Sequence, residues 1–217
     1  MNNASFTEKL KEAELFNQFT SDKNNTDEKT ALFAQIILLF AEEKELPTEQ
    51  LKTFPAAAII DYLKKSHVTY LNKKLPEIEL QLIQLSNLPG ELTETLASVF
   101  SWLQKNMEKH FRVEEKSLFP YIEDLEKTKT SLLTTEDLKA KYKDFSIQYF
   151  IDSHHDDVEN KLEEIKKYIV HSLKSMEELF PYRILLQKLD DLEKDLRLHA
   201  KVEDEILVPL ALEWEKK

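Results

Sequence analysis

Apolar residues recur at intervals of three and four along the chain from about Phe54 onward. This spacing places them on one face of a helix, so each run predicts an amphipathic helix. Four such runs lie within residues 60–85, 92–118, 151–169 and 189–210. Pro89-Gly90 is the clearest helix breaker and separates the first two runs, while a break near Phe180-Pro181 precedes the fourth. Pro120 is expected to kink or end the second helix.

The composition also favours an all-α fold, because the 217 residues include a single glycine and abundant Leu, Glu and Lys. We therefore predict an antiparallel up-down four-helix bundle over residues 56–217, preceded by a short N-terminal helical extension over residues 1–55. The extension is expected to contain two or three short helices, with ALFAQIILLFAEE as an apolar segment and DKNNTDEK as a loop. It is expected either to cover the bundle or to build a homodimer.

Charge and residue usage exclude several classes of partner and site. The formal net charge of −11 argues against nucleic acid and against an anionic membrane surface. The chain has no cysteine, so any metal must be held by nitrogen and oxygen ligands. The start, MNNASFTEKL, lacks the features of a signal peptide, and the longest apolar run is too short to span a bilayer. A cytoplasmic location is the resulting expectation.

Two similar phrases place polar residues on the apolar stripes. HFRVEEKSLFP begins at His110, and HAKVEDEILVP begins at His199. In both phrases a His and a Glu four residues later stand where leucine would be expected, and the glutamates are Glu114 and Glu203. A buried carboxylate without a partner costs several kcal/mol. These residues therefore predict that something neutralises them inside the core.

The histidines follow an internal repeat of a two-helix unit. His67 precedes His110 by 43 residues, and His155 precedes His199 by 44. Each two-helix unit is expected to place its two histidines and its glutamate at the same depth of the bundle. Four histidines and two carboxylates would then converge on one site. Such a set suits two iron or manganese ions bridged by Glu114 and Glu203. The stripe does not decide between His154 and His155.

Each of these features also has a simpler interpretation. A single His-x-x-x-Glu usually forms a solvated pair on a helix surface, but two copies on core stripes favour a metal site. Glu115 and Asp204 are expected to be outward charges, and His171 a surface histidine. The Leu and Pro of LFP and LVP are expected to be packing and helix-end residues.

The motifs together resemble the hemerythrin-like (HHE cation-binding) family, and within it the RIC-type (repair of iron centres) di-iron proteins. The resemblance covers roughly residues 56–217, through IIDYLKKSHVTYLNKKLPEIE, HFRVEEKSLFP, SHHDDVE and HAKVEDEILVP. It favours His155, because HDD begins there. It implies the following metal ligands: His67, His110, Glu114, His155, His199 and Glu203. Position 159 is Glu159, where the oxygen-carrying hemerythrins use histidine, so the four-His, two-Glu version is the closer match.

The resemblance implies two non-haem iron ions, bridged by carboxylates and an oxo group. One implied role is in the nitric oxide and oxidative stress response, by binding NO or O2 or by supplying iron to damaged iron–sulfur proteins. The other is an oxygen or iron sensing or storage module without catalysis. The residues leave these two classes, and hence enzymatic activity, open. RIC-type proteins often carry an N-terminal cysteine pair that this chain lacks.

Overall fold

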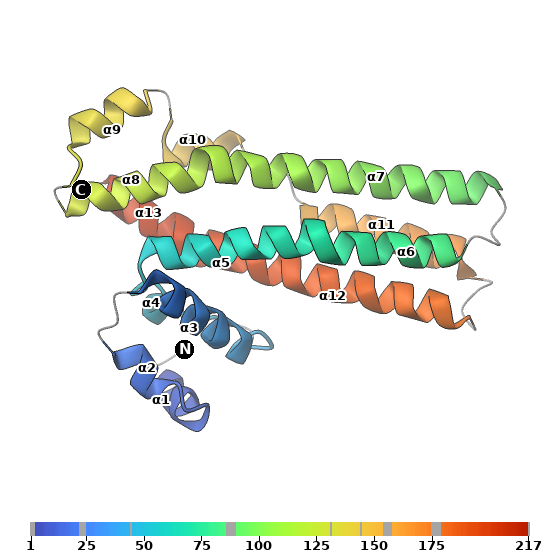
Figure 1. Ribbon diagram of the computed structural model, residues 1–217, viewed down its shortest axis with the longest axis horizontal. Helices are drawn as coiled ribbons and strands as arrows, with labels where there is room; N and C mark the ends of the chain where they lie inside the picture. Colours follow the sequence, from blue (N-terminus) through green and yellow to red (C-terminus); the bar gives the residue numbers. More distant parts are fainter. Residues whose placement is uncertain are drawn as a thin grey trace. The chain divides into compact units, whose positions relative to one another are not determined.

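The computed structural model of the protein is built from helices (Figure 1). It describes residues 3–216 apart from 22–24, 44, 86–89, 131, 144, 154–157 and 175–178. No β-strand occurs within these ranges, so the predicted all-α fold is confirmed. The chain forms two compact units: unit 1 comprises residues 1–65, 117–152 and 201–217, and unit 2 comprises residues 66–116 and 153–200.

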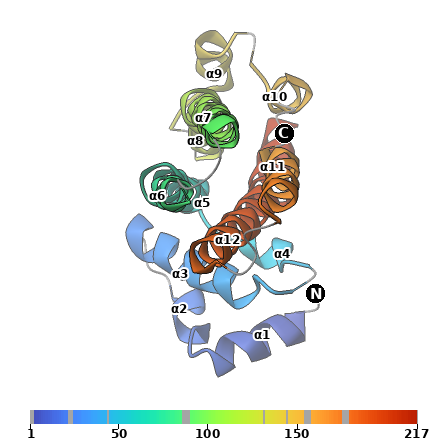
Figure 2. The same cartoon turned by 90° about the vertical axis from the view of Figure 1, so that its right-hand side faces the viewer.

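Unit 2 is a helical bundle around a single apolar core. Its described helical segments are the end of α5 (Ala56–Thr69), η1 (Tyr70–Lys74), α6 (Leu75–Gln84), α7 (Gly90–Val113), the start of η2 (Glu114–Leu118), α11 (Val158–Ser172) and most of α12 (Phe180–Val202). Viewed end on, α6, α7, α11 and α12 surround the core (Figure 2). The antiparallel up-down order of these helices stays a prediction. The breaks expected near Pro89-Gly90 and Phe180-Pro181 fall where α7 and α12 begin.

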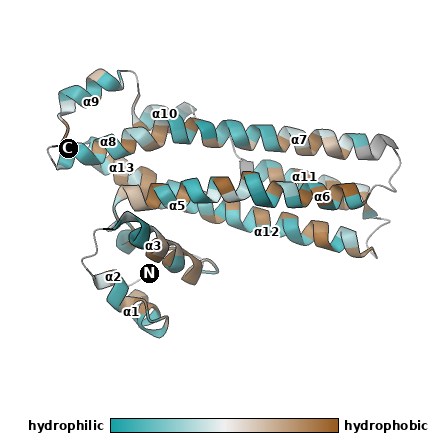
Figure 3. Ribbon diagram, viewed as in Figure 1, coloured by the Kyte–Doolittle hydropathy of each residue, from teal (hydrophilic) through white to brown (hydrophobic). Residues whose placement is uncertain are grey.

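The core of unit 2 is made by the predicted apolar stripes. Leu103 and Met107 of α7 are buried, as are Leu189, Leu192 and Leu196 of α12. Figure 3 shows apolar residues recurring along α6, α7 and α12 between hydrophilic ones, as expected of helices that bury one face. This packing provides the frame that carries the buried histidines described below.

Polar contacts at the edge of this core join neighbouring helices of unit 2. The Tyr70 hydroxyl donates a hydrogen bond of 3.0 Å to the backbone carbonyl of Asp195. The ammonium of Lys188 lies 2.7 Å from a carboxylate oxygen of Glu77. The first contact fixes Tyr70, whose ring lies beside one of the buried histidines.

Unit 1 contains the N-terminal helices together with segments from later in the chain. Its helices besides the start of α5 are α1 (Asn3–Glu12), α2 (Phe16–Thr20), α3 (Thr26–Leu39), α4 (Thr48–Leu51), α8 (Phe119–Lys129), α9 (Thr135–Lys141), α10 (Ile147–Ser153), η4 (Glu203–Leu207) and α13 (Val208–Glu215). The last residue of α10 and the end of α12 cross the boundary between the units.

The N-terminal segment differs in detail from the expectation. It has four described helices rather than two or three. The second half of the expected loop DKNNTDEK forms the first turn of α3, because the Asn25 side chain accepts a hydrogen bond of 3.1 Å from the Asp27 N–H and caps the helix. Phe33 of α3 packs edge-on against Tyr62 of α5 at 5.4 Å. Unit 1 thus combines parts of residues 1–55 and 56–217, and the division at residue 55 stays a prediction.

The helix that carries Glu114 does not end at Pro120. It continues through a π-helical turn, η2 (Glu114–Leu118), into α8, where Pro120 occupies the first turn. Proline has no N–H, and its ring collides with the carbonyl four residues earlier in a regular α-helix. A wider turn with bonds to the fifth residue back relieves this collision and lets the helix continue.

The same arrangement occurs twice more in the described part of the chain. Pro76 follows the start of η1 by six residues, and Pro209 follows the start of η4 by six residues, as Pro120 follows Glu114. In η1 the N–H of Leu75 bonds to the carbonyl of Tyr70, five residues back, as a π turn requires. The prolines of LFP and LVP are therefore part of a continuous helix rather than helix ends. None of the described helices combines the length and the apolar character needed to cross a membrane.

Candidate metal centre

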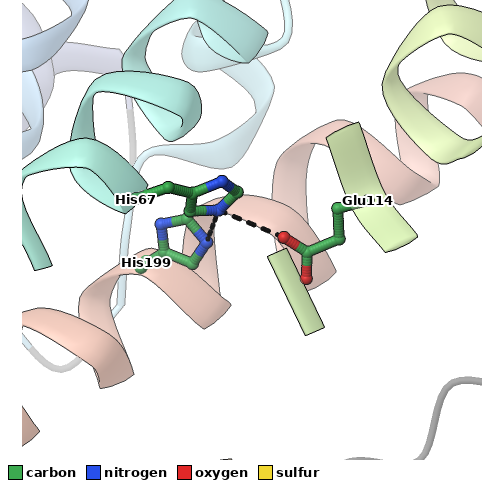
Figure 4. Close-up of side chains that lie close together, drawn as sticks. All are labelled: His67, Glu114 and His199. Carbon is green, nitrogen blue, oxygen red and sulfur yellow. Dashed lines mark hydrogen bonds and ion pairs between the residues drawn. The ribbon is translucent and has the colours of Figure 1, made fainter. Parts of the chain in front are cut away.

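Three donor side chains of unit 2 meet in its interior. His67 lies near the end of α5, Glu114 opens η2, and His199 lies near the end of α12. Each offers one ligand atom, and these atoms all lie within 4.8 Å of one another. Figure 4 shows the three side chains pointing toward one another from three separate helical segments.

The imidazole of His67 is at the centre of this group. Its Nε2 lies 3.1 Å from Oε2 of Glu114 and 3.2 Å from Nε2 of His199 (Figure 4). The exposed fractions of His67, Glu114 and His199 are 1%, 0% and 3%. A carboxylate and two imidazoles therefore face a common point out of contact with bulk water.

His110 approaches the other oxygen of the same carboxylate. Its Nε2 lies 2.7 Å from Oε1 of Glu114, one helical turn away. The His110 side chain is 14% exposed, so it lies closer to solvent than the other donors. The two oxygens of Glu114 thus serve two different imidazoles, which is the arrangement expected of a bridging carboxylate.

Two aromatic rings pack against the donor imidazoles. Phe111 stacks on His67 with ring centroids 4.0 Å apart and planes within 10°. Tyr70 meets His199 edge-on, with centroids 5.8 Å apart. Both aromatic side chains are buried, so they fix the planes of the two imidazoles and keep water away from them. Neither Phe111 nor Tyr70 was predicted from the sequence to lie at the site, although Phe111 directly follows His110.

Glu115 departs from its expected role. It is exposed, as an outward charge should be, but its Oε1 lies 2.8 Å from Nδ1 of His67. The sequence offered only the adjacent pair Glu114-Glu115 as a signal for this contact. Asp204 and His171 are exposed, as expected.

Burial lowers the pKa of His199 to about 3, and the neighbouring His67 and His110 act in the same direction, while Glu114 opposes them. His199 is therefore neutral at neutral pH. A neutral imidazole is the form that binds a metal, because one of its nitrogens keeps a lone pair.

The donor set suits a divalent or trivalent cation of the iron or manganese kind. Imidazole nitrogen and carboxylate oxygen are favourable ligands for these ions, and the chain has no cysteine to favour a zinc–thiolate site. A cation between His67, Glu114 and His199 would also offset the cost of burying the Glu114 carboxylate.

The structure brings together His67, His110, Glu114 and His199 of the six predicted ligands. Glu203 is buried and opens η4 in unit 1. His155, and the alternative His154, lie outside the described residues. The full set of six ligands stays a prediction.

Comparison with known proteins points in the same direction. The family model of the hemerythrin HHE cation-binding domain matches residues 58–211. No curated protein and no solved structure matches the chain. The matched range includes every residue of the buried donor cluster and covers well over half of the sequence. The chain therefore belongs to the hemerythrin HHE cation-binding domain family.

Proposed function

We propose that the protein is a cytoplasmic non-haem di-iron protein of the RIC type, which binds nitric oxide or oxygen and acts in the repair of iron centres under nitrosative and oxidative stress. The observation that carries this proposal is the buried convergence of His67, Glu114 and His199 within a cation-binding domain. Damaged iron–sulfur proteins are the proposed recipients of its iron.

The proposed ligands fall into two groups, one supported by distances in the structure and the other by the sequence pattern. His67, His110, Glu114 and His199 are supported by their mutual distances. His155 and Glu203 are supported by the repeated sequence pattern, in which the second two-helix unit matches the first. When bound, two irons would supply a redox-active centre with a coordination position for a diatomic ligand.

The protein's own groups prepare the site for such a ligand. His199 is kept neutral by burial, and the stacked ring of Phe111 holds His67 in one plane. The aromatic rings make the surroundings apolar, which suits a small uncharged molecule such as NO or O2 and excludes water. The partly exposed His110 lies on the side of the cluster nearest to solvent.

Iron and nitric oxide chemistry is favoured over oxygen carriage because of the carboxylates. Anionic, hard carboxylate ligands stabilise the ferric state. Position 159 is Glu159, so the chain has fewer histidines for the site than an oxygen-carrying hemerythrin. The reduced protein is therefore expected to oxidise in air rather than to hold oxygen reversibly.

The test is made on purified protein loaded with iron. The protein is reduced, exposed to air and returned to vacuum while its charge-transfer bands are recorded, and a second reduced sample is exposed to NO without oxygen. Oxidation in air together with an NO adduct supports the proposal. Clean recovery of the reduced spectrum over several cycles would replace it with the oxygen sensing or storage alternative.

A further inference from the structure

The imidazole of His67 is held between two consecutive carboxylates. Glu114 lies 3.1 Å from Nε2, and Glu115 lies 2.8 Å from Nδ1. The ring is 1% exposed, and Phe111 stacks on its face. Both nitrogens of one buried ring are therefore contacted by adjacent residues of a single helical turn.

The π turn explains how two neighbours reach the same ring. In an α-helix consecutive side chains point about 100° apart, which separates them on the helix surface. Glu114 and Glu115 are the first two residues of η2, where the wider turn of the backbone brings consecutive side chains closer in direction. Pro120, which follows six residues after the start of η2, favours this turn because it cannot donate the regular α-helical bond.

We propose that Glu115 is a positioning residue that holds a proton on Nδ1 of His67 and thereby presents Nε2 to the cation. The inference rests on the proposed cation-binding function and concerns how one of its ligands is prepared. Both ring nitrogens contact a carboxylate oxygen, but a cation held between His67, Glu114 and His199 would take the lone pair of Nε2, which leaves the proton on Nδ1, where the Glu115 carboxylate can accept it. The other nitrogen, Nε2, then provides the lone pair for the metal.

The surroundings of Nε2 agree with this assignment. Nε2 is the atom that faces both Glu114 and His199, whose Nε2 lies 3.2 Å away. Metal-binding histidines commonly donate their second N–H to a carboxylate, which fixes the tautomer and the direction of the ring. Because the Glu115 side chain is 40% exposed, the contact runs from the buried cluster to the protein surface.

Two substitutions separate positioning from a general effect of charge. Glu115→Gln removes the charge but keeps a side-chain oxygen that can accept the Nδ1–H, whereas Glu115→Ala removes both. The affinity for Fe(II) is measured without oxygen by competition with a coloured chelator. We expect Glu115→Ala to bind Fe(II) about 10–100-fold more weakly than the wild type, and Glu115→Gln to recover most of this loss. A contribution from charge alone would weaken both variants equally.

A spectroscopic measurement reports on the tautomer itself. In Zn(II)-loaded protein with ¹⁵N-labelled histidine, the wild type and Glu115→Gln should show a protonated Nδ1 and a metal-bound Nε2 for His67. Glu115→Ala should lose the protected Nδ1–H signal. Glu205→Ala, which removes an exposed glutamate from the π turn η4, is the matched control and should bind Fe(II) as the wild type does.

The outcomes distinguish the inference from the function on which it rests. Failure of the wild-type protein to bind Fe(II) would reject the proposed function. If the wild type binds Fe(II) normally, two results would reject the positioning role alone. One is a Glu115→Ala variant with the same affinity as the wild type, and the other is a Glu115→Gln variant as weak as Glu115→Ala. If circular dichroism shows that Glu115→Ala does not fold, Glu115→Leu, which also lacks an acceptor but keeps the side-chain volume, takes its place in both measurements.

Discussion

Asp124 of α8 is a buried carboxylate whose contribution to stability should depend on pH. It is 7% exposed and accepts hydrogen bonds from Lys127 at 2.7 Å, Lys141 at 2.5 Å and the Tyr142 hydroxyl at 2.9 Å. Lys141 ends α9 and Tyr142 directly follows it. Asp124 therefore joins this segment to α8 within unit 1.

The hydrogen bonds decide the ionisation of Asp124. Burial alone would raise its pKa, but the bonds from Lys127, Lys141 and Tyr142 outweigh burial and lower the pKa from 3.8 to about 2. Because the pKa is lower in the folded protein, the ionised group stabilises the fold above pH 3.8, and this stabilisation is lost as the pH falls toward 2. The difference corresponds to about 2 kcal/mol at neutral pH, of which roughly half should remain at pH 3.

The measurement is urea unfolding of the wild type and Asp124→Asn, followed by far-UV circular dichroism. At pH 7 the variant is expected to be less stable by about 2 kcal/mol, and at pH 3 the difference should fall to about 1 kcal/mol. Glu136→Gln, at an exposed position of α9, is the control and should differ little from the wild type at either pH. An equal loss at both pH values would refute the reasoning, because packing rather than charge would then be responsible.

Three further predictions concern the metal ligands. Protein produced with ample iron should hold about two irons per chain, since six ligands and bridging groups can complete two octahedral sites; a single zinc per chain would contradict this. Glu114→Ala should lose metal while His171→Ala keeps it, because only the first removes a buried donor, and equal metal contents would reject Glu114 as a ligand. His155→Ala should abolish one iron site and His154→Ala leave it nearly intact, and the opposite result would assign the ligand to His154.

The burial of the predicted ligands could be inferred from the sequence because periodicity indicates which face of a helix is covered. His67, Glu114, His199 and Glu203 were expected inside from their places on apolar stripes, and all four are buried. His110 was expected inside for the same reason but is 14% exposed. The residues that contact them across the cluster were harder to predict from periodicity. Glu115 is adjacent to Glu114 in sequence, and regular helix geometry directs it away from the core.

The π turn explains why Glu115 nevertheless reaches His67, and the sequence contains a signal for such turns. The buried positions Leu63, His67 and Leu75, with Leu71 half-buried between them, follow one another in steps of four. Three steps of four span twelve residues, whereas three α-helical turns span about eleven. One residue is thus in excess, which is the mark of a π turn. The division of residues 1–55 into four helices had no comparable signal, because α2 and α4 have only five and four residues and are too short to show a period.

Since a π turn contains one residue more than an α turn, each of η1, η2 and η4 is equivalent to a single-residue insertion that the helix has accommodated. An alignment of this chain with a protein that has regular α turns at these places should therefore require three one-residue gaps, each between a predicted ligand and the proline that follows it. An alignment forced through without gaps would lose its register at η1, so Glu114 and the core positions that follow would be matched with the wrong residues. Correct gap placement thus decides whether ligands are identified correctly in such comparisons.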